Sequence, residues 1–340
     1  LAGEVATIRN GNHEVLIKKT LSDWGNAPRP LAWGLGDEPR ATYMNEMAKY
    51  VASWRKFAPG EPVTTVVMHS DVSAAKTVGF DALANDVYPF FSKDNPNRYM
   101  GRDYTAWIDK TKILRASVNV PWMMGQTYQE PWGPIEIAPS GNIVYLPGSA
   151  PHWVMPSPKQ VAWQTLAAVA KGAQGMFYFA YRLTPSPKLK WAPASKLPAK
   201  VSVPTDSGAP MGLVHMNGAS TPQYEAMAEA FGWVAKHRPF LAKLRYAPAG
   251  EQLKVSGNYA NAASVFVHSD SGKLYLIAAS SYMSTPEAQA FRIVFASQAM
   301  AIRNIETGVV ANLNAATDGM ATVLRMPPAT ASIFEIVKDN

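Results

Sequence analysis

The first two-thirds of the chain alternates short apolar runs with amphipathic stretches, and this alternation constrains the fold more than any other feature. The apolar runs have the length of strands and lie at residues 30–35, 62–68, 82–87, 117–124 and 175–180. Helical spacing of apolar residues marks the stretches 14–21, 42–57, 104–114 and 159–171, and a further helix begins at Thr221-Pro222. Strands that alternate with helices form a parallel sheet, because each helix carries the chain back across the sheet. We therefore predict an α/β fold.

The pattern changes after residue 247. Short alternating runs follow, separated by turn signals, at residues 263–268, 273–279, 291–295, 301–305, 321–325 and 332–337. Runs of this kind are typical of antiparallel sheets with one buried face. We predict two domains, an α/β domain over residues 1–247 and a small β-sandwich over residues 248–340.

Two adjacent carboxylates, Asp37 and Glu38, end the apolar run that contains Trp33 and stand directly before Pro39. Proline lacks a backbone donor, so it ends strand pairing, and the carboxylates fall at the carboxyl end of the predicted strand. In α/β barrels, catalytic side chains gather at that end. The alternative is an acidic turn without a function.

The order of the motifs resembles the (β/α)8-barrel glycoside hydrolases of the broad clan that includes β-galactosidase-like and cellulase-like enzymes. Residues 31–39 resemble the fourth barrel strand, whose Asn-Glu-Pro carries the general acid/base, with Asp37 in place of the asparagine. Asp86-Val87-Tyr88-Pro89 resembles the sixth strand, residues 118–126 the seventh and residues 164–181 the eighth. The resemblance implies a barrel of which strands four to eight are visible. We expect the N-terminal part of the same protein, as a separate segment, to supply the rest.

Glycoside hydrolysis needs two carboxyl groups across the scissile bond. The resemblance implies that Glu38 is the general acid/base. It also implies a nucleophile at the end of the seventh strand, where this chain has Gln126. The second carboxyl is therefore open between Glu130, which we place first, and Asp86.

Further residues near predicted strand ends are candidates for binding the sugar. They are Asp37, His69, Tyr88, Trp122, Gln126, Tyr128, Tyr178 and Tyr181. Aromatic rings stack on the C–H faces of sugars, but aromatics are also frequent in cores, and we expect about half of these rings to be core. For His69, a structural role is an equal alternative.

The net charge of +7 is unevenly distributed, because residues 137–205 contain no Asp or Glu. Within this region Lys188, Lys190 and Trp191 combine cations with an aromatic ring in a proline-rich loop. Charge and stacking together favour an anionic ligand, such as a sugar with carboxylate or sulfate groups. The alternative is a solvated face.

Several classes of protein are disfavoured. The chain has no cysteine, and its six histidines show no HExxH pattern, so we expect neither a metal site nor a cofactor. No nucleic-acid-binding signature appears, and no apolar stretch is long enough to span a membrane. Residues 1–4 do not begin a signal peptide, yet the resemblance leads us to expect a periplasmic or secreted protein.

Together these features predict a glycoside hydrolase that acts on a polysaccharide or oligosaccharide, which would be its carbohydrate partner. The alternative is a non-catalytic carbohydrate-binding or structural protein on a degenerate barrel scaffold, because fold does not fix function.

Overall fold

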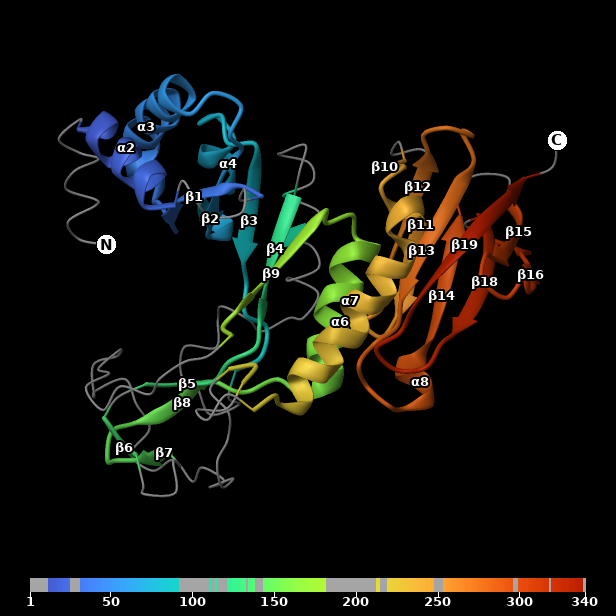
Figure 1. Cartoon of the computed structure of the whole chain (residues 1–340). Coiled ribbons are helices and arrows are strands. Elements are labelled where there is room, and N and C mark those ends of the chain that lie inside the picture. Colours follow the sequence, from blue (N-terminus) through green and yellow to red (C-terminus); the bar gives the residue numbers. More distant parts are fainter. Residues whose placement is uncertain are drawn as a thin grey trace. The chain divides into compact units, whose positions relative to one another are not determined.

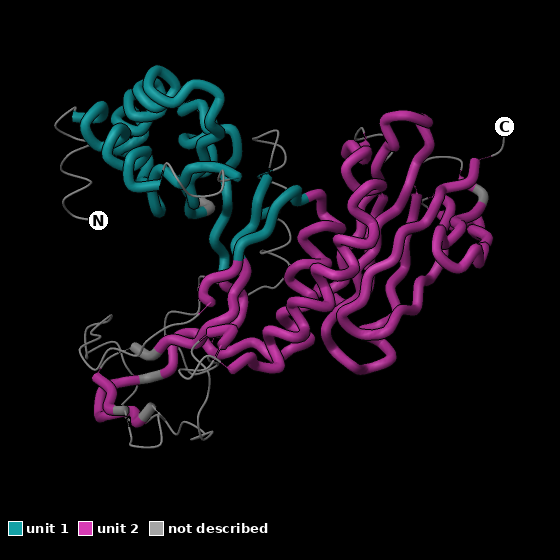
Figure 2. Tube along the Cα trace, viewed as in Figure 1, with its two compact units in different colours: residues 1–87, 110–124, 173–177 teal, residues 88–109, 125–172, 178–340 magenta. Residues whose placement is uncertain are grey.

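The computed structural model describes residues 12–24, 31–91, 110–111, 114, 121–132, 134–137, 143–181, 212–214, 219–247, 253–295, 299–317 and 319–338. The chain divides into two compact units (Figure 2). Unit 1 contains residues 1–87, 110–124 and 173–177, and unit 2 contains residues 88–109, 125–172 and 178–340. The domain boundary at residue 248 stays a prediction.

The parallel sheet contains all five strands that the sequence predicts. In spatial order they are β1 (Trp33–Asp37), β2 (Val63–Val67), β3 (Ala82–Asp86), β4 (Pro121–Gln126) and β9 (Gly175–Phe179). Pairing is parallel from β1 to β2, from β2 to β3 and from β3 to β4. The predicted α/β fold is confirmed. These strands run in the order expected for the second half of a (β/α)8 barrel, and β4 and β9 each pass from unit 1 into unit 2.

Helices of unit 1 follow and precede these strands (Figure 1). They are α2 (His13–Trp24), the 3-10 helix η1 (Ala41–Tyr43), α3 (Met44–Phe57), the 3-10 helix η2 (His69–Asp71) and α4 (Val72–Ala75). The apolar residues of α3 recur on one face, and that face is buried. Burial of such a stripe supplies most of a helix's stability, which explains why the spacing alone predicted α3.

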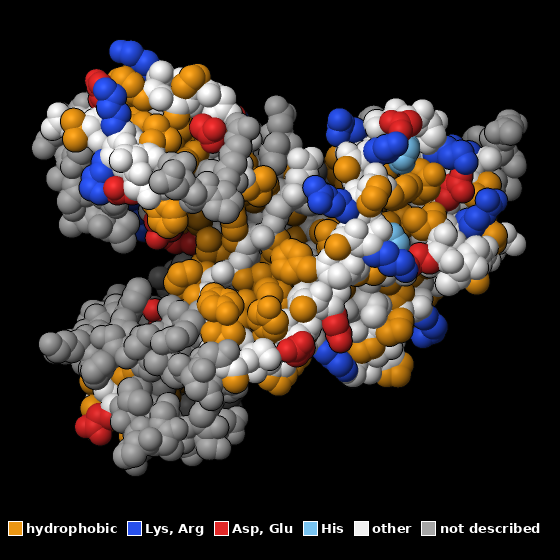
Figure 3. Space-filling view, in the orientation of Figure 1, with side chains coloured by type: hydrophobic (Ala, Val, Ile, Leu, Met, Phe, Trp, Pro, Cys, Tyr) orange, Lys and Arg blue, Asp and Glu red, His pale blue; other side chains and the backbone are white. Residues whose placement is uncertain are grey.

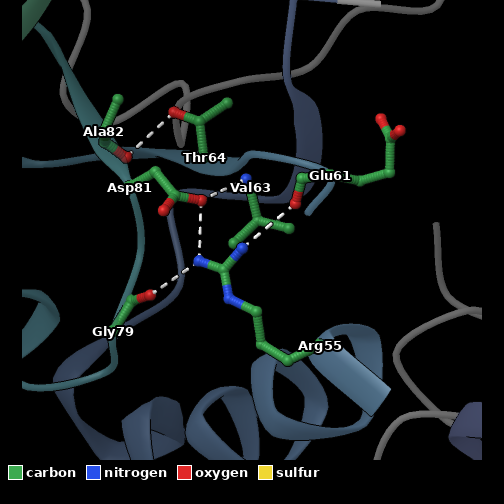
Figure 4. A network of polar contacts seen from close by, with 7 residues as sticks. All are labelled: Arg55, Glu61, Val63, Thr64, Gly79, Asp81 and Ala82. Atoms are coloured by element: carbon green, nitrogen blue, oxygen red, sulfur yellow. Dashed lines mark hydrogen bonds and ion pairs between the residues drawn. The ribbon is translucent and has the colours of Figure 1, made fainter. Parts of the chain in front are cut away.

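Arg55, in the last turn of α3, joins three segments of unit 1 (Figure 4). Its guanidinium donates to the carbonyls of Glu61 (3.0 Å) and Gly79 (3.3 Å) and to Asp81 Oδ2 (2.7 Å). Asp81 Oδ2 also accepts the backbone N–H of Val63 at 2.7 Å. The planar guanidinium donates in several directions at once, so it fixes the segments that lead into β2 and β3 relative to α3.

In unit 2, α6 (Pro158–Ala170) begins at Ser157, whose side chain and that of Gln160 form a reciprocal capping box. The helix α7 (Pro222–Leu241) begins at Thr221, as the Thr-Pro pair predicted. The two helices pack side by side, and α6 also contacts the strands β12, β13 and β19 defined below (Figure 1). In the part of the chain that the structure describes, no helix is long and apolar enough to cross a membrane.

Two short hairpin-like pairs between β4 and α6 were not predicted. The strand β5 (Glu130–Trp132) pairs with β8 (Ala150–Trp153), and β6 (Ile135–Ile137) pairs with β7 (Ile143–Tyr145). Each strand has only three or four residues, which is too short for alternation to stand out, and prolines interrupt the β5–β8 pair.

The last part of unit 2 consists of antiparallel sheets, as predicted. One has the order β10 (Leu244–Tyr246), β12 (Ala262–His268), β13 (Leu274–Ala279), β19 (Ala331–Lys338), β15 (Ala299–Asn304) and β16 (Val310–Asn312). The other has the order β11 (Leu253–Gly257), β14 (Ala290–Phe295), β18 (Gly319–Arg325) and β17 (Asn314–Ala316), and the short helix α8 (Pro286–Gln289) precedes β14.

One apolar core joins these two sheets. Val265 and Leu276 of the first sheet and Phe291, Ile293 and Leu324 of the second belong to the same cluster of buried side chains. Alternating burial along each strand turns these side chains toward the shared core, which is why the six longer strands were visible in the sequence.

Candidate active site

A group of carboxylates lies at the carboxyl ends of β1 and β3 in unit 1. Asp37 ends β1, Glu38 follows it, and Asp86 ends β3. The backbone of Glu38 has a φ of 46°, a left-handed conformation that is uncommon for a residue other than glycine. Its N–H donates to the carbonyl of Val66 on β2 at 3.0 Å. Strained backbone of this kind clusters at functional sites.

The side chain of Glu38 lies close enough to Asp86 to perturb the ionisation of its carboxyl group. Burial raises the pKa of Asp86 well above its ordinary value, and the neighbouring Glu38 carboxyl raises it further. Partial desolvation, together with the charge of Glu38, also raises the pKa of Asp37. Two neighbouring carboxyls cannot both ionise easily, so Asp86 keeps its proton to a higher pH than an ordinary aspartate does.

The sequence reasoning did not single out Lys110, which also belongs to this site. Burial lowers its pKa, while the charge of Asp86 acts in the opposite direction. This interaction places Lys110 near the Asp86 carboxyl group. Lys110 falls within a predicted helix, and a single lysine there gives no signal that it faces a carboxylate.

Asp71 is the second residue that sequence reasoning missed, and it ties together the loops that follow β1 and β2. Its Oδ1 accepts the backbone N–H of Ala41 at 2.9 Å, and its Oδ2 accepts from the hydroxyl of Ser70 at 2.9 Å. Arg40 lies 3.8 Å from the same carboxylate. Asp71 thus fixes the segment that immediately follows Glu38 and Pro39.

Gln126, at the position of the expected nucleophile, is fully buried in unit 2. Its Oε1 accepts the N–H of Phe90 at 2.9 Å, and its Nε2 donates to the carbonyls of Phe90 (2.7 Å), Val154 (2.8 Å) and Tyr128 (3.3 Å). The predicted contact with substrate is therefore wrong, because backbone groups occupy the whole amide. The sequence showed the residue at a strand end but not the chain folded around it.

Four aromatic rings of unit 2 form a connected cluster near Gln126. Tyr88 lies edge-on to Tyr128 (centroids 5.1 Å apart) and to Trp153 (5.6 Å). Phe179 lies 5.1 Å from Tyr128 and 6.2 Å from Tyr88. Tyr128 and Trp153 are buried, whereas 41% of Phe179 is exposed. Only part of the cluster is therefore open to a ligand.

The remaining aromatic candidates separate into core and surface. Trp122 is buried against Ala82, Ala84 and Phe177, so its predicted contact with substrate is wrong and it belongs to the core. The same correction applies to Tyr128, which is buried. Tyr178 is half-buried and its hydroxyl donates to the Val161 carbonyl on α6 at 2.9 Å, and its predicted contact with substrate stays a prediction.

Tyr88 is half-buried and Tyr181 is 62% exposed, so both stay available to a ligand. In the space-filling view, hydrophobic side chains gather over β4 and β9 (Figure 3).

Glu130 belongs to unit 2, where it pairs with Trp153 across β5 and β8. Burial raises its pKa to about 7. Its role as the second catalytic carboxyl stays a prediction. The side chain of His69, and the whole of Lys188, Lys190 and Trp191, lie outside the described residues. Among the described residues, no cluster of His, Asp and Glu has the form of a metal site.

Part of this chain is similar to a known protein family. Residues 40–192 match the β-galactosidase model of glycoside hydrolase family 42. This match includes β2, β3, β4 and β9 of the parallel sheet together with α6. The resemblance to barrel glycoside hydrolases that the motifs indicated is confirmed. A search of curated proteins finds no match.

Among solved structures, the β-galactosidase from the psychrophilic Marinomonas ef1 is similar at 15% identity and a TM-score of 0.38, over 69% of this chain and 37% of that one. An α-amylase from Geobacillus thermoleovorans is 10% identical with a TM-score of 0.44, over 87% of this chain and 58% of that one. An α-L-arabinofuranosidase from Thermotoga maritima is 10% identical with a TM-score of 0.38, over 97% and 73%. The chain spans less than two thirds of the length of the β-galactosidase and the α-amylase.

Proposed function

We propose that this chain is part of a glycoside hydrolase that cleaves a polysaccharide or oligosaccharide, with Glu38 and Asp86 as its pair of carboxyls. The proximity of these two carboxyl groups, at the carboxyl ends of β1 and β3, is the observation that carries the proposal. It is supported by the β-galactosidase family match over residues 40–192. Asp86 takes precedence over Glu130 here because Asp86 and Glu38 belong to one compact unit.

The raised pKa of Asp86 suits the chemistry. One carboxyl must give a proton to the glycosidic oxygen while the other acts as an anion, either as nucleophile or as base. Transfer of the Asp86 proton to Glu38 would make Glu38 the acid and leave Asp86 as a carboxylate.

The test compares wild type with Glu38→Gln and Asp86→Asn on neutral, uronate-containing and sulfated glycans, following new reducing ends. We expect both variants to lose at least about 100-fold in rate, because acid–base groups contribute on that scale. Glu46→Gln, on α3 of the same unit, is the matched control and should keep wild-type rates.

Binding without release by the wild-type protein would instead favour the non-catalytic carbohydrate-binding function. Gln126 supports this second candidate, because no carboxylate stands where the resemblance implies a nucleophile.

We also propose an anionic substrate, on the basis of Lys188, Lys190 and Trp191 in the acid-free region of the sequence. Attraction between charges weakens once salt brings the Debye length below about 8 Å. Binding of a sulfated or uronate-containing glycan should therefore fall as salt is raised. An affinity independent of salt would contradict the proposal.

The N-terminal part of the same protein is the proposed partner that completes the sheet. Among the described residues, β1 and β9 are the edge strands of the parallel sheet and each pairs on one side only. Co-expression with the preceding segment should protect backbone amides of β1 from hydrogen exchange. A periplasmic or secreted location is proposed as well, and cell fractionation tests it.

A further inference from the structure

We propose that Gln126 is a positioning residue that holds the aromatic cluster of Tyr88, Tyr128, Trp153 and Phe179 as a rigid surface for stacking the C–H face of a sugar ring. This inference rests on the proposed function, since it assigns a sugar-contacting surface to the same enzyme. Gln126 itself touches no ligand, because its side chain is fully buried.

The amide of Gln126 reaches the backbone of every segment that carries a ring of the cluster, except that of Phe179. It bonds both the N–H and the carbonyl of Phe90, two residues after Tyr88. It donates to the carbonyl of Tyr128 itself and to that of Val154, which directly follows Trp153. Phe179 is held by the residue next to Gln126, because its carbonyl accepts the N–H of Thr127 at 2.9 Å.

Only an amide fits this place. The surrounding groups are three carbonyl oxygens and one N–H, so the side chain must donate from one end and accept at the other. A carboxylate would direct lone pairs at three carbonyls in a buried site, which is strongly unfavourable. Gln126 is therefore chemically suited to positioning and unsuited to acting as a nucleophile.

The surface that it positions is both rigid and partly open. Tyr128 meets Phe179 edge-on at an interplanar angle of 86°, and Tyr88 meets it at 36°, so two rings support the one that is exposed. A ring held in place loses little freedom when a ligand covers it, and the polarised C–H face of a pyranose fits an aromatic face. Phe179 is the ring that we assign to direct contact with sugar.

The test measures binding of cellotetraose and β-1,4-galactotetraose by calorimetry, so that no hydrolysis is needed. Phe179→Ala should weaken binding of at least one of them about five- to tenfold, on the scale of an aromatic contact. Gln126→Met keeps the side-chain length but removes the hydrogen bonds. It should weaken binding similarly and change the near-ultraviolet circular dichroism of the cluster.

A kinetic readout separates positioning from general damage. Because Gln126→Met leaves Glu38 and Asp86 intact, we expect a raised KM with kcat within about twofold of wild type. If Gln126→Met does not fold, Gln164→Met, which loosens the same strand end, takes its place. Trp24→Leu, which removes an exposed ring from α2, is the control and should change nothing.

Unchanged binding and KM in folded Phe179→Ala or Gln126→Met protein would overturn the inference, even if wild type is an active hydrolase. The reverse outcome is distinguishable. Sugar binding that depends on Phe179 but is not followed by release would contradict the hydrolase function and leave the stacking surface standing. If the wild-type protein binds neither tetrasaccharide, the proposed stacking surface is overturned.

Discussion

The side-chain amide of Gln164 pairs with the backbone of Gln126 as a neighbouring strand would. Gln164 Oε1 accepts the N–H of Gln126 at 2.7 Å, and its Nε2 donates to the Gln126 carbonyl at 2.8 Å. Gln126 repeats the arrangement on Phe90 with its own side chain. Two buried amides thus connect α6 to the end of β4 and then to the segment that contains Phe90.

Removal of the Gln164 amide should destabilise the protein. Gln164→Leu leaves the N–H and the carbonyl of Gln126 buried without their partner, and each such group costs about 1–3 kcal/mol. We expect a loss of about 2 kcal/mol or more in the free energy of unfolding, measured by urea titration. Gln223→Leu, which removes a half-buried bond to Pro156, should cost clearly less. Equal losses would contradict this ranking.

Gly175 is required by the ring of Trp122. A Cβ at position 175 would lie 2.5 Å from Trp122 Cδ1 and 2.6 Å from its Nε1. Gly175→Ala should therefore destabilise the fold by about 1–3 kcal/mol, the usual cost of overpacking a core. A Cβ at Gly34 meets nothing within 4 Å, so Gly34→Ala is the matched control. Thermal unfolding of the two variants is the measurement. An unchanged melting temperature for Gly175→Ala would contradict the packing argument.

Arg55 should not be replaceable by lysine. Arg55→Lys keeps the charge beside Asp81 but cannot reach the carbonyls of Glu61 and Gly79 as well. We expect Arg55→Lys to lose about 1–2 kcal/mol of unfolding free energy, because hydrogen bonds to a charged group are lost. Lys243→Ala breaks an exposed ion pair with Asp270 and should cost less than about 1 kcal/mol. Denaturant titration that shows no difference between the two would contradict this.

Glu130 should make stability fall as the pH rises toward neutrality. Its pKa is raised by burial from 4.5 to about 7, so the folded state binds this proton more tightly than the unfolded chain does. The stabilisation is complete below about pH 4.5 and is lost as the pH rises through 7. Glu130→Gln should remove this part of the pH dependence, as measured by unfolding free energies across that range. An unchanged slope would show that Glu130 does not titrate in this way.

His152, also in unit 2, should make stability fall as the pH is lowered, the opposite of the effect of Glu130. Burial lowers its pKa from 6.5 to about 3, so the folded state disfavours the charged ring. Its contribution to stability is present above about pH 6.5 and is lost as the pH falls toward 3. His152→Gln should flatten the acidic limb of the stability curve while leaving the Glu130 limb in place. If the unfolding free energies of His152→Gln and wild type depend on pH in the same way, a lowered pKa for His152 is contradicted.

The sequence by itself determined the parallel strands, α3, α6, α7 and the longer strands of the antiparallel sheets. In each of these elements, burial of one face imposes a periodic pattern of apolar residues, and that pattern is visible in one dimension. It also placed Glu38 and Asp86 at strand ends, because Pro39 and Pro89 mark where pairing stops. The family resemblance was visible in the sequence because it depends on motifs at these same strand ends.

Only the tertiary structure decided which of these residues meet. The proximity of Asp86 to Glu38, the position of Lys110 near Asp86 and the bond from Ala41 to Asp71 all join segments far apart in sequence. Likewise, nothing local distinguishes a buried Gln126 from one that faces a substrate, and Tyr178 turns to α6 whereas its neighbour Phe179 turns to solvent. Periodicity encodes which side of an element is buried, but packing decides which polar atoms find partners there and which stay available for chemistry.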